Sequence, residues 1–182
     1  MNSCVKLFNA DEMMAAVRDL AGQIAGHFAS SDREFALVGI HQLGVSLARL
    51  LHEELAKLGR DADFGMLDIT MYRDDIGTRN MLPRIHETVI PFDVNEREII
   101  LVDDVLSTGR TIRAALDALT DYGRPGLIRL AVLVDRGDPE FPIRADFVGL
   151  RATLPAERKV LVNFEAANGL EAGIYDVNWQ NK

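Results

Sequence analysis

The sequence is poor in the residue types on which several classes of protein depend. It contains a single cysteine, Cys4, which excludes an internal disulfide framework, and no cluster of cysteine and histidine indicates a structural zinc site. No apolar run reaches the length that spans a membrane, and the first residues lack the charged and apolar regions of a secretory signal. We therefore expect a cytoplasmic protein without a membrane partner.

Basic residues are in deficit as well. The 20 Lys and Arg residues against 28 Asp and Glu residues leave a net charge of −8. This balance argues against the broad basic surface that commonly accompanies nucleic-acid binding, although it leaves room for a local patch, so RNA is a disfavoured partner. A length of 182 residues with 48% hydrophobic composition predicts a single globular domain over residues 1–182.

A strand, an acidic pair, a polar loop and a helix follow one another in the middle of the chain. Ile99–Val102 is a continuous apolar run, too short for a helix, and predicts a buried parallel strand that stops at Asp103 and Asp104. Apolar residues at helical spacing from Ile112 to Tyr122 predict a helix after the loop. The loop itself contains Ser107, Thr108, Gly109, Arg110 and Thr111.

This loop is suited to an anion. Its backbone N–H groups can turn toward one point, and the positive end of the following helix favours negative charge there, most simply a phosphate. Asp103 and Asp104 would repel a phosphate, so they need partners of their own: vicinal ribose hydroxyls, a lysine or arginine, or hydrated Mg²⁺. A ligand that carries a phosphate and a diol satisfies both halves. The alternative is an ordinary strand-to-helix turn beside a solvated acidic pair.

The rest of the chain alternates between predicted strands and helices. We expect Asp11 to cap a first helix, and a second helix to have an apolar face from Leu47 to Leu58. Residues 73–88 show no clear periodicity and predict a lid loop. The predicted core strands are Phe35–Ile40, Phe64–Met71 and Leu127–Val134, and short antiparallel strands are expected at Phe147–Leu150, Val160–Phe164 and Gly173–Val177.

This alternation is typical of an α/β fold. We expect a central parallel sheet flanked by helices over about residues 10–137, and a small antiparallel β cap over about residues 138–180. Ligands of such sheets bind beyond the carboxyl ends of the strands. Four polar segments follow predicted strands and are expected to share one pocket: His41–Gly44, Arg73–Asp75, Asp103–Thr111 and Asp135–Gly137.

The segment DDVLSTGRT, residues 103–111, resembles the phosphoribosyl pyrophosphate (PRPP) motif of type I phosphoribosyltransferases. Five other segments are similar to the PyrR family, pyrimidine operon regulators that also act as uracil phosphoribosyltransferases. They are VGI at 38–40, DITMYRDD at 68–75, DYGRP at 121–125, LVDRG at 133–137 and PIRAD at 142–146. The resemblance implies a type I phosphoribosyltransferase-like fold, conversion of uracil and PRPP into UMP and pyrophosphate, and a homo-oligomer.

The implied chemistry is mainly positioning. By resemblance, Asp103 and Asp104 orient the ribose and Ser107–Thr111 hold the 5′-phosphate. Charge that develops during cleavage at the ribose C1′ calls for electrostatic stabilisation rather than a covalent nucleophile. Mg²⁺ is the implied cofactor, bound mainly through PRPP or pyrophosphate oxygens and water, and no side chain is assigned to it as a metal ligand.

The implied pyrophosphate site is the loop that begins with His41 and Gln42. Many relatives carry basic or hydroxyl side chains there, so in this chain the backbone N–H groups are left to bind pyrophosphate. Arg73 can reach the same group from the base of the lid; its alternative role is an ion pair with Asp74 or Asp75. Of the four histidines only His41 is singled out, and the other three, His27, His52 and His86, are expected at the surface.

Val134 and Arg136 are the candidates for the uracil pocket. The end of Val134 can offer backbone groups to the edge of the base, and Arg136 can frame the pocket, although a structural salt bridge is its alternative role. The roles of Arg79 and Arg84 in the lid stay open.

Two other functions stay open. A UMP-sensing, RNA-binding transcription attenuation regulator with weak catalysis fits the altered loop at His41, but the first helix lacks the basic face that RNA phosphates demand. A purine phosphoribosyltransferase is disfavoured by the pyrimidine-branch segments after Met71 and Val134. The residues that form either a basic patch or an ordinary solvated rim are Arg144, Arg151, Arg158 and Lys159.

Overall fold

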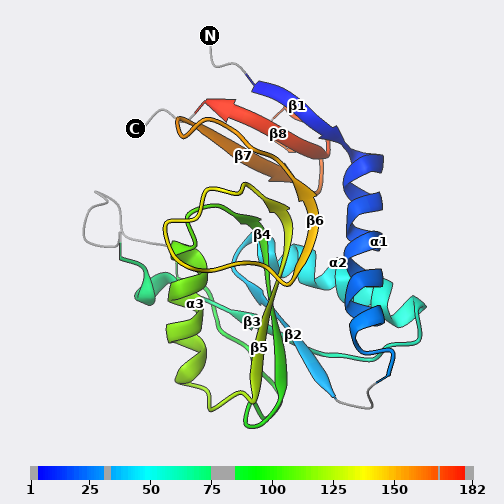
Figure 1. Ribbon diagram of the computed structural model, residues 1–182, viewed down its shortest axis with the longest axis vertical. Coiled ribbons are helices and arrows are strands. Elements are labelled where there is room, and N and C mark those ends of the chain that lie inside the picture. The colour runs from blue at the N-terminus through cyan, green and yellow to red at the C-terminus, as the bar shows by residue number, and fades with distance from the viewer. Residues whose placement is uncertain (1–3, 31–33, 75–84, 168, 179–182) are drawn as a thin grey trace.

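The structure is a computed structural model and describes residues 4–30, 34–74, 85–167 and 169–178. Its described part contains two sheets with helices packed around the larger one (Figure 1). The larger sheet is parallel and consists of β2 (Phe35–Ile40), β3 (Asp63–Leu67), β4 (Glu98–Leu106), β5 (Leu127–Asp135) and β6 (Phe147–Arg151). The small antiparallel sheet consists of β1 (Cys4–Asn9), β7 (Arg158–Asn163) and β8 (Gly173–Asn178). The helices are α1 (Ala10–His27), α2 (Leu43–Lys57) and α3 (Arg110–Thr120), with a short 3₁₀ turn η1 (Thr70–Tyr72).

The predicted α/β fold, with a parallel sheet, flanking helices and a small β cap, is confirmed. The strand order of the main sheet is β3-β2-β4-β5-β6, so the chain passes from β2 to β3 on one side and then crosses to β4 on the other. This order places a topological switch point between β2 and β4. Open α/β sheets bind their ligands at the carboxyl ends of the strands beside such a point.

Each core strand contributes side chains to both faces of the main sheet, as the two-residue period of a strand requires. Leu37 and Ile100 pack with α1, α2 and the small sheet, whereas Val38 and Leu101 pack with α3. Figure 1 shows α1 and α3 on opposite flanks of the molecule and the small sheet at one end. The cap is therefore joined to the main sheet by a continuous apolar core.

Asn9 is the cap of the first helix, so the predicted cap at Asp11 is wrong. The Asn9 Oδ1 atom accepts the backbone N–H of Glu12 at 3.0 Å, and the Glu12 carboxylate accepts the backbone N–H of Asn9 at 2.8 Å. This reciprocal pair satisfies two backbone N–H groups at the helix start. The difference arises because β1, which we did not predict, runs directly into α1 and places the helix start before Asp11.

We expect Asn9→Ala to lower the free energy of unfolding by about 1 kcal/mol, because the Glu12 N–H loses its acceptor. Asp11→Ala is the matched control, and it removes only a favourable interaction with the helix dipole, of about 0.3 kcal/mol. Urea unfolding followed by circular dichroism measures both changes. Equal losses in the two variants would contradict a cap at Asn9.

Two strand ends differ from the prediction. β3 ends at Leu67 rather than Met71, because the Asp68 carboxylate accepts the N–H of Thr70 at 2.6 Å and turns the chain into η1. β4 continues through Asp103 and Asp104 to Leu106 rather than stopping at the acids. Pairing with β5 keeps this polar segment in the strand, since Asp103 pairs with Val132 and Leu106 with Asp135.

The β cap also differs in membership. The predicted antiparallel strand Phe147–Leu150 is in fact β6, the parallel edge strand of the main sheet. The cap instead gains β1, which pairs with β8. A short apolar run does not reveal which strand will pair with it, so neither exchange was visible in the sequence.

Two apolar side chains lie beyond the helices that we predicted to include them. Leu58 is 54% exposed after the end of α2, and Tyr122 is 46% exposed after the end of α3. In the part of the chain that the structure describes, no helix combines the length and the apolar character that crossing a membrane requires.

Candidate nucleotide site at the carboxyl ends of β2, β4 and β5

The loop after β2 and the end of β4 are in direct contact. A Cβ atom placed on Gly44 would lie 2.4 Å from the carbonyl oxygen of Val102 and 3.3 Å from the Asp103 Oδ1 atom. Only glycine permits this approach. The switch point of the sheet therefore brings together two of the four predicted site segments, His41–Gly44 and the acidic pair.

Asp103 and Asp104 form an acidic pair at this edge, with Asp103 buried and Asp104 half-buried. Asp103 is 6% exposed, and its Oδ1 atom accepts the backbone N–H of Asp104 at 3.1 Å. Burial raises the pKa of the Asp103 carboxyl well above its usual value, and the charge of Asp104 raises it further. Burial also raises the pKa of Asp104. Such a pair is stabilised by hydroxyl donors or cations, which a bound ribose or a metal ion can supply.

The polar loop leads into the N-terminus of α3. Gly109 has a φ angle of 88°, in the left-handed region that favours glycine. As the N-cap residue it offers no side chain, and the Thr108 hydroxyl accepts the Arg110 N–H only at 3.4 Å. The Thr108 carbonyl accepts the backbone N–H groups of Glu140 and Phe141 at 2.9 and 3.1 Å. The Ser107 hydroxyl donates to Asp138 at 3.2 Å. The loop is thus fastened to the segment after β5, while the helix N-terminus remains available for an anion.

The Arg110 guanidinium is bound by acidic side chains outside this loop. It contacts Asp74 at 2.8 Å and Glu140 at 2.6 Å and lies 5.4 Å from the ring centroid of Phe141. The hydrogen bond to Glu140, followed by that to Asp74, raises the pKa of Arg110. Because two carboxylates already bind the Arg110 side chain, the backbone N–H of Arg110 is the group that fits the predicted phosphate site.

Arg73 lies close enough to the acidic pair to act on it electrostatically. Its positive charge opposes the rise in the pKa of Asp103. The alternative role, an ion pair with Asp74 or Asp75, stays open, and the Asp74 carboxylate also contacts Arg110 at 2.8 Å and Arg113 at 3.7 Å. Asp75 lies outside the described residues.

The two residues proposed for the base pocket are both buried. The Val134 side chain packs in the core between the main sheet and the cap, so only its backbone can face a ligand. Arg136 is 5% exposed, pairs with Asp138 at 3.1 Å and donates to the carbonyl of Pro155 at 3.3 Å. This geometry favours the structural alternative for Arg136, which fastens the cap to the core.

His86, which we expected at the surface, is half-buried and lies against the loop after β2. Its ring stacks on the ring of His41, with centroids 4.8 Å apart and an angle of 13° between the planes. The Gln42 Nε2 atom lies 3.0 Å from the His86 Nε2 atom. No spacing or periodicity in the sequence connects position 86 with position 41, so sequence reasoning had no signal for this contact.

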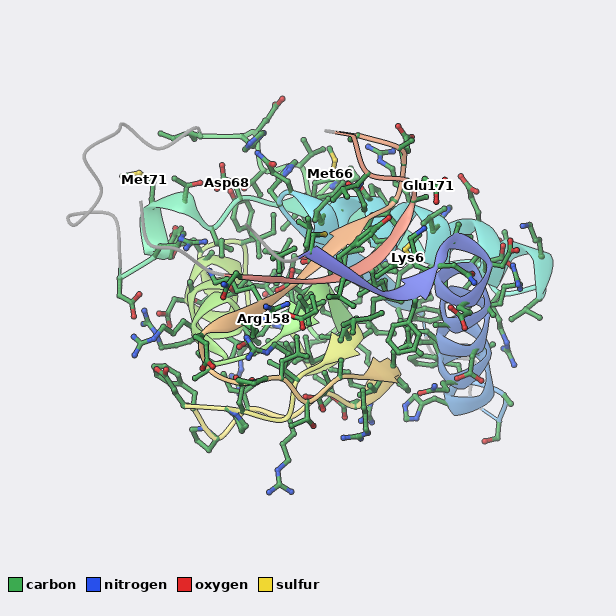
Figure 2. All side chains as sticks on the ribbon, turned by 90° about the horizontal axis from the view of Figure 1, so that it is seen from above. Lys6, Met66, Asp68, Met71, Arg158 and Glu171 are labelled. Carbon is green, nitrogen blue, oxygen red and sulfur yellow. The ribbon has the colours of Figure 1, made fainter. Side chains whose placement is uncertain are left out.

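Of the predicted lid, residues 73–88, the structure describes only the two ends. Asp68 and Met71 lie on the segment that leads from β3 into it (Figure 2). The Tyr72 hydroxyl donates to the Asp121 carboxylate and so ties this segment to the end of α3. Arg79 and Arg84 lie outside the described residues.

The proposed basic patch is interleaved with acids. Arg151 pairs with Asp135 at 3.3 Å, and Arg158 pairs with Asp176 at 2.6 Å. These pairs favour a solvated, charge-balanced rim over a continuous basic surface.

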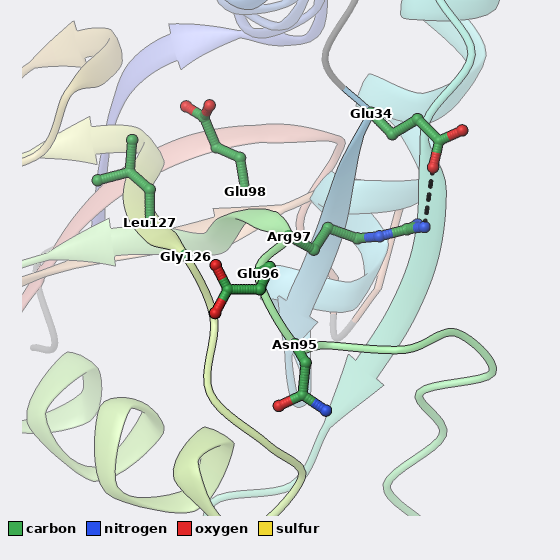
Figure 3. A pocket seen from close by; sticks show the side chains of 7 residues that line it. All are labelled: Glu34, Asn95, Glu96, Arg97, Glu98, Gly126 and Leu127. Carbon is green, nitrogen blue, oxygen red and sulfur yellow. Dashed lines mark hydrogen bonds and ion pairs between the residues drawn. The ribbon is translucent and has the colours of Figure 1, made fainter.

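A cavity of about 550 Å³ lies at the opposite end of β4 from the acidic pair (Figure 3). Glu98, the first residue of β4, lines it together with Arg97, Gly126 and neighbouring polar side chains. The Glu98 carboxylate is held by Arg129 at 2.7 Å. This cavity is at the amino end of the strands and is not part of the candidate site.

The carboxylates of the candidate site suit a metal ion that is held partly by its ligand. In the described residues, no group of three or more His, Cys, Asp and Glu side chains converges as a metal cage. Mg²⁺ commonly binds through one or two carboxylates together with substrate phosphates and water. Asp103 and Asp104 fit that mode.

Comparison with known proteins identifies a family match over most of the chain. Residues 5–160 match the family described as phosphoribosyl transferase domain. A protein of Roseiflexus sp. (strain RS-1), named bifunctional protein PyrR, is 46% identical over 94% of this chain and 94% of its own length. The protein of the same name from Thermus aquaticus is 48% identical over 90% of this chain and 91% of its own.

Solved structures share the fold at low identity. A hypoxanthine phosphoribosyltransferase from Trypanosoma cruzi superposes with a TM-score of 0.73 at 14% identity, covering 95% of this chain and 94% of that one. A hypoxanthine-guanine phosphoribosyltransferase from Bacillus anthracis gives 0.67 at 16% identity, covering 96% of each chain. At this identity the likeness concerns the fold alone.

Proposed function

The chain belongs to the PyrR family of phosphoribosyltransferases, and on this premise we propose that it acts in the cytoplasm as a uracil phosphoribosyltransferase. It converts uracil and PRPP into UMP and pyrophosphate, with pyrimidine-operon regulation as its second role. One observation carries the proposal: the acidic pair at the end of β4 lies between an uncapped helix N-terminus on one side and the loop after β2 on the other.

Different groups of the protein bind the three parts of PRPP. The ribose hydroxyls donate to Asp103 and Asp104, which relieves the repulsion between the two carboxylates. Backbone N–H groups at Gly109–Thr111 bind the 5′-phosphate at the positive end of α3. Backbone N–H groups at the start of α2 hold the pyrophosphate, because the N-cap residue Gln42 makes no side-chain cap.

Catalysis follows from this placement. Cleavage at the ribose C1′ leaves positive charge on the sugar and negative charge on the departing pyrophosphate. In this proposal the carboxylates face the sugar, whereas Arg73 and the N-terminus of α2 face the pyrophosphate. Mg²⁺ bound with PRPP would be held mainly by PRPP oxygens and water, with Asp103 and Asp104 as the nearby carboxylates, and would supply positive charge against the pyrophosphate. The protein contributes fixed charges and orientation rather than a nucleophile.

Uracil is the proposed base because of the family, not because of the fold. The structural neighbours act on hypoxanthine or guanine, but they share only 14–16% identity with this chain. The PyrR relatives share 46–48%. The backbone at the end of β5 is the surface that we propose for the uracil edge, and Arg136 fastens the cap above it.

Regulation through RNA is the second half of the proposal. The shared name, bifunctional protein PyrR, supports it, whereas the net charge of −8 and the acid-paired arginines of the cap oppose a broad phosphate-binding surface. The homo-oligomer that the resemblance implies stays a prediction.

Purified protein incubated with Mg²⁺, PRPP and one free base at a time tests the proposal. We expect UMP and pyrophosphate from uracil, and no nucleotide from hypoxanthine or guanine. UMP binding measured in parallel by calorimetry reports on the phosphate and ribose site without catalysis. Formation of inosine or guanosine monophosphate would overturn the uracil assignment, and UMP-dependent RNA retention without any UMP formation would favour a regulator that does not catalyse.

A further inference from the structure

His86 lies over the loop that we propose for the pyrophosphate. Its ring is stacked on His41 at 4.8 Å between centroids, and its Nε2 atom lies 3.0 Å from the amide Nε2 of Gln42. The two imidazoles and the amide therefore form one polar layer at the start of α2, although they come from segments far apart in the sequence.

The backbone around His86 is firmly attached to β3. Val89 and Met66 exchange two backbone hydrogen bonds of 2.8 Å, and the Asp68 N–H donates to the Thr88 hydroxyl at 2.9 Å. The His86 N–H donates to the Asp68 carboxylate. This end of the lid is thus an added strand-like edge that holds the imidazole in place.

The Asp68 carboxylate that anchors His86 is ionised over the physiological range. Burial alone would raise the pKa of Asp68, but hydrogen bonds from Thr70 and from the His86 backbone outweigh burial and lower it below its usual value. The anchor is therefore a charge-assisted hydrogen bond rather than a contact with a neutral acid.

The groups around this polar layer of His41, Gln42 and His86 favour an anion. The N-terminal N–H groups of α2 have no side-chain cap, and Gly44 places this loop against Asp103. The His41 Nε2 atom is buried and has no hydrogen-bond partner among the described residues. Buried polar atoms without partners are rare, and a site that its ligand completes is one reason for them.

We propose that His86 is a substrate-binding residue that contacts the pyrophosphate group of PRPP together with His41, an inference that rests on the proposed function. The Gln42 amide donates to His86 Nε2, so the proton of the neutral ring resides on Nδ1 and is available to a phosphate oxygen. Recognition of the leaving group is then shared by the loop after β2 and His86, whereas the PRPP motif holds the ribose and the 5′-phosphate.

Replacing His86 with alanine tests the inference. We expect the KM for PRPP, and the KM for pyrophosphate in the reverse reaction, to rise about tenfold, the loss of one hydrogen bond to a charged group. The KM for uracil and the Kd for UMP should stay unchanged, because neither molecule carries pyrophosphate. His86→Arg should restore the affinity for PRPP, since a guanidinium also binds phosphate oxygens.

Ile85→Ala is the matched control, because Ile85 is the neighbouring residue and its side chain is 64% exposed. It should leave every constant unchanged. A KM for PRPP within twofold of the wild-type value in the alanine variant would overturn the inference. So would an equal loss of UMP affinity, because that pattern indicates a structural role.

The failure of the proposed function can be told apart from the failure of this inference. Wild-type protein that forms no UMP contradicts the proposed function. Direct calorimetric binding of Mg²⁺–PRPP then reports on His86 alone: a tenfold weaker Kd in the alanine variant, with the Kd for UMP intact, supports the contact, and an unchanged Kd overturns it.

Discussion

Asp103→Asn is expected to lower kcat/KM for PRPP by about 100-fold, because the ribose hydroxyls lose a charged acceptor and the sugar loses a carboxylate beside the charge that develops at C1′. The same change should stabilise the ligand-free protein. Burial and the neighbouring Asp104 make the ionised Asp103 unfavourable in the folded state. A neutral amide of the same shape removes that cost, and we expect a gain of about 1 kcal/mol at pH 7.

The pH dependence has a definite sign. The pKa of Asp103 is raised in the folded state, so between the ordinary carboxyl pKa and the folded pKa the folded protein binds more protons than the unfolded chain. Stability from this group is therefore full at low pH and is lost as pH rises toward the folded pKa. The gain of the Asp103→Asn variant should accordingly be largest at neutral pH and should vanish below about pH 4.

Chemical denaturation at several pH values, together with steady-state kinetics, measures both effects. Asp117→Asn is the control, since Asp117 is exposed on α3 and forms a surface pair with Arg113. It should leave activity and stability nearly unchanged. An Asp103→Asn variant that keeps full activity, or that is less stable at neutral pH than at acidic pH relative to wild type, would contradict this account of the acidic pair.

Gly44→Ala is expected to abolish most of the activity and to destabilise the fold. The added methyl group would meet the Val102 carbonyl oxygen at 2.4 Å and the Asp103 Cα atom at 3.2 Å, and both belong to the backbone of a central strand. Moving either atom would disturb the hydrogen bonds of the central strand, so the loop after β2 must separate from β4. Overpacking of this kind costs about 1–3 kcal/mol. A displacement of about 1 Å between the two halves of the PRPP site is enough to reduce kcat/KM by about 100-fold.

Gly22→Ala is the matched control for this substitution. Gly22 lies within α1, and a Cβ atom there would have nothing within 4 Å. The replacement should raise the free energy of unfolding by about 0.5–1 kcal/mol and leave activity unchanged. Thermal unfolding and PRPP kinetics on both variants separate the effects. Normal activity in Gly44→Ala would mean that contact between the loop after β2 and β4 is not needed for the PRPP site.

The sequence alone determined the α/β class, the parallel core strands and the acidic pair followed by an anion loop. Local patterns of residues predict these features: continuous apolar runs predict the buried strands, and helical spacing predicts α3. The family resemblance then added the ligand. The structure confirms the fold, and the comparisons confirm the family.

Only the tertiary structure decided which distant groups meet. It extended β4 through its two aspartates because β5 pairs along their whole length, and it exchanged β6 for β1 in the cap. In the structure the Arg110 side chain binds Asp74 and Glu140, and Arg136 is buried. The ring of His86 stacks on that of His41. Each of these contacts joins segments that are separated along the chain, and its free energy depends on burial and on a partner's position. A local pattern of residues carries information about neither.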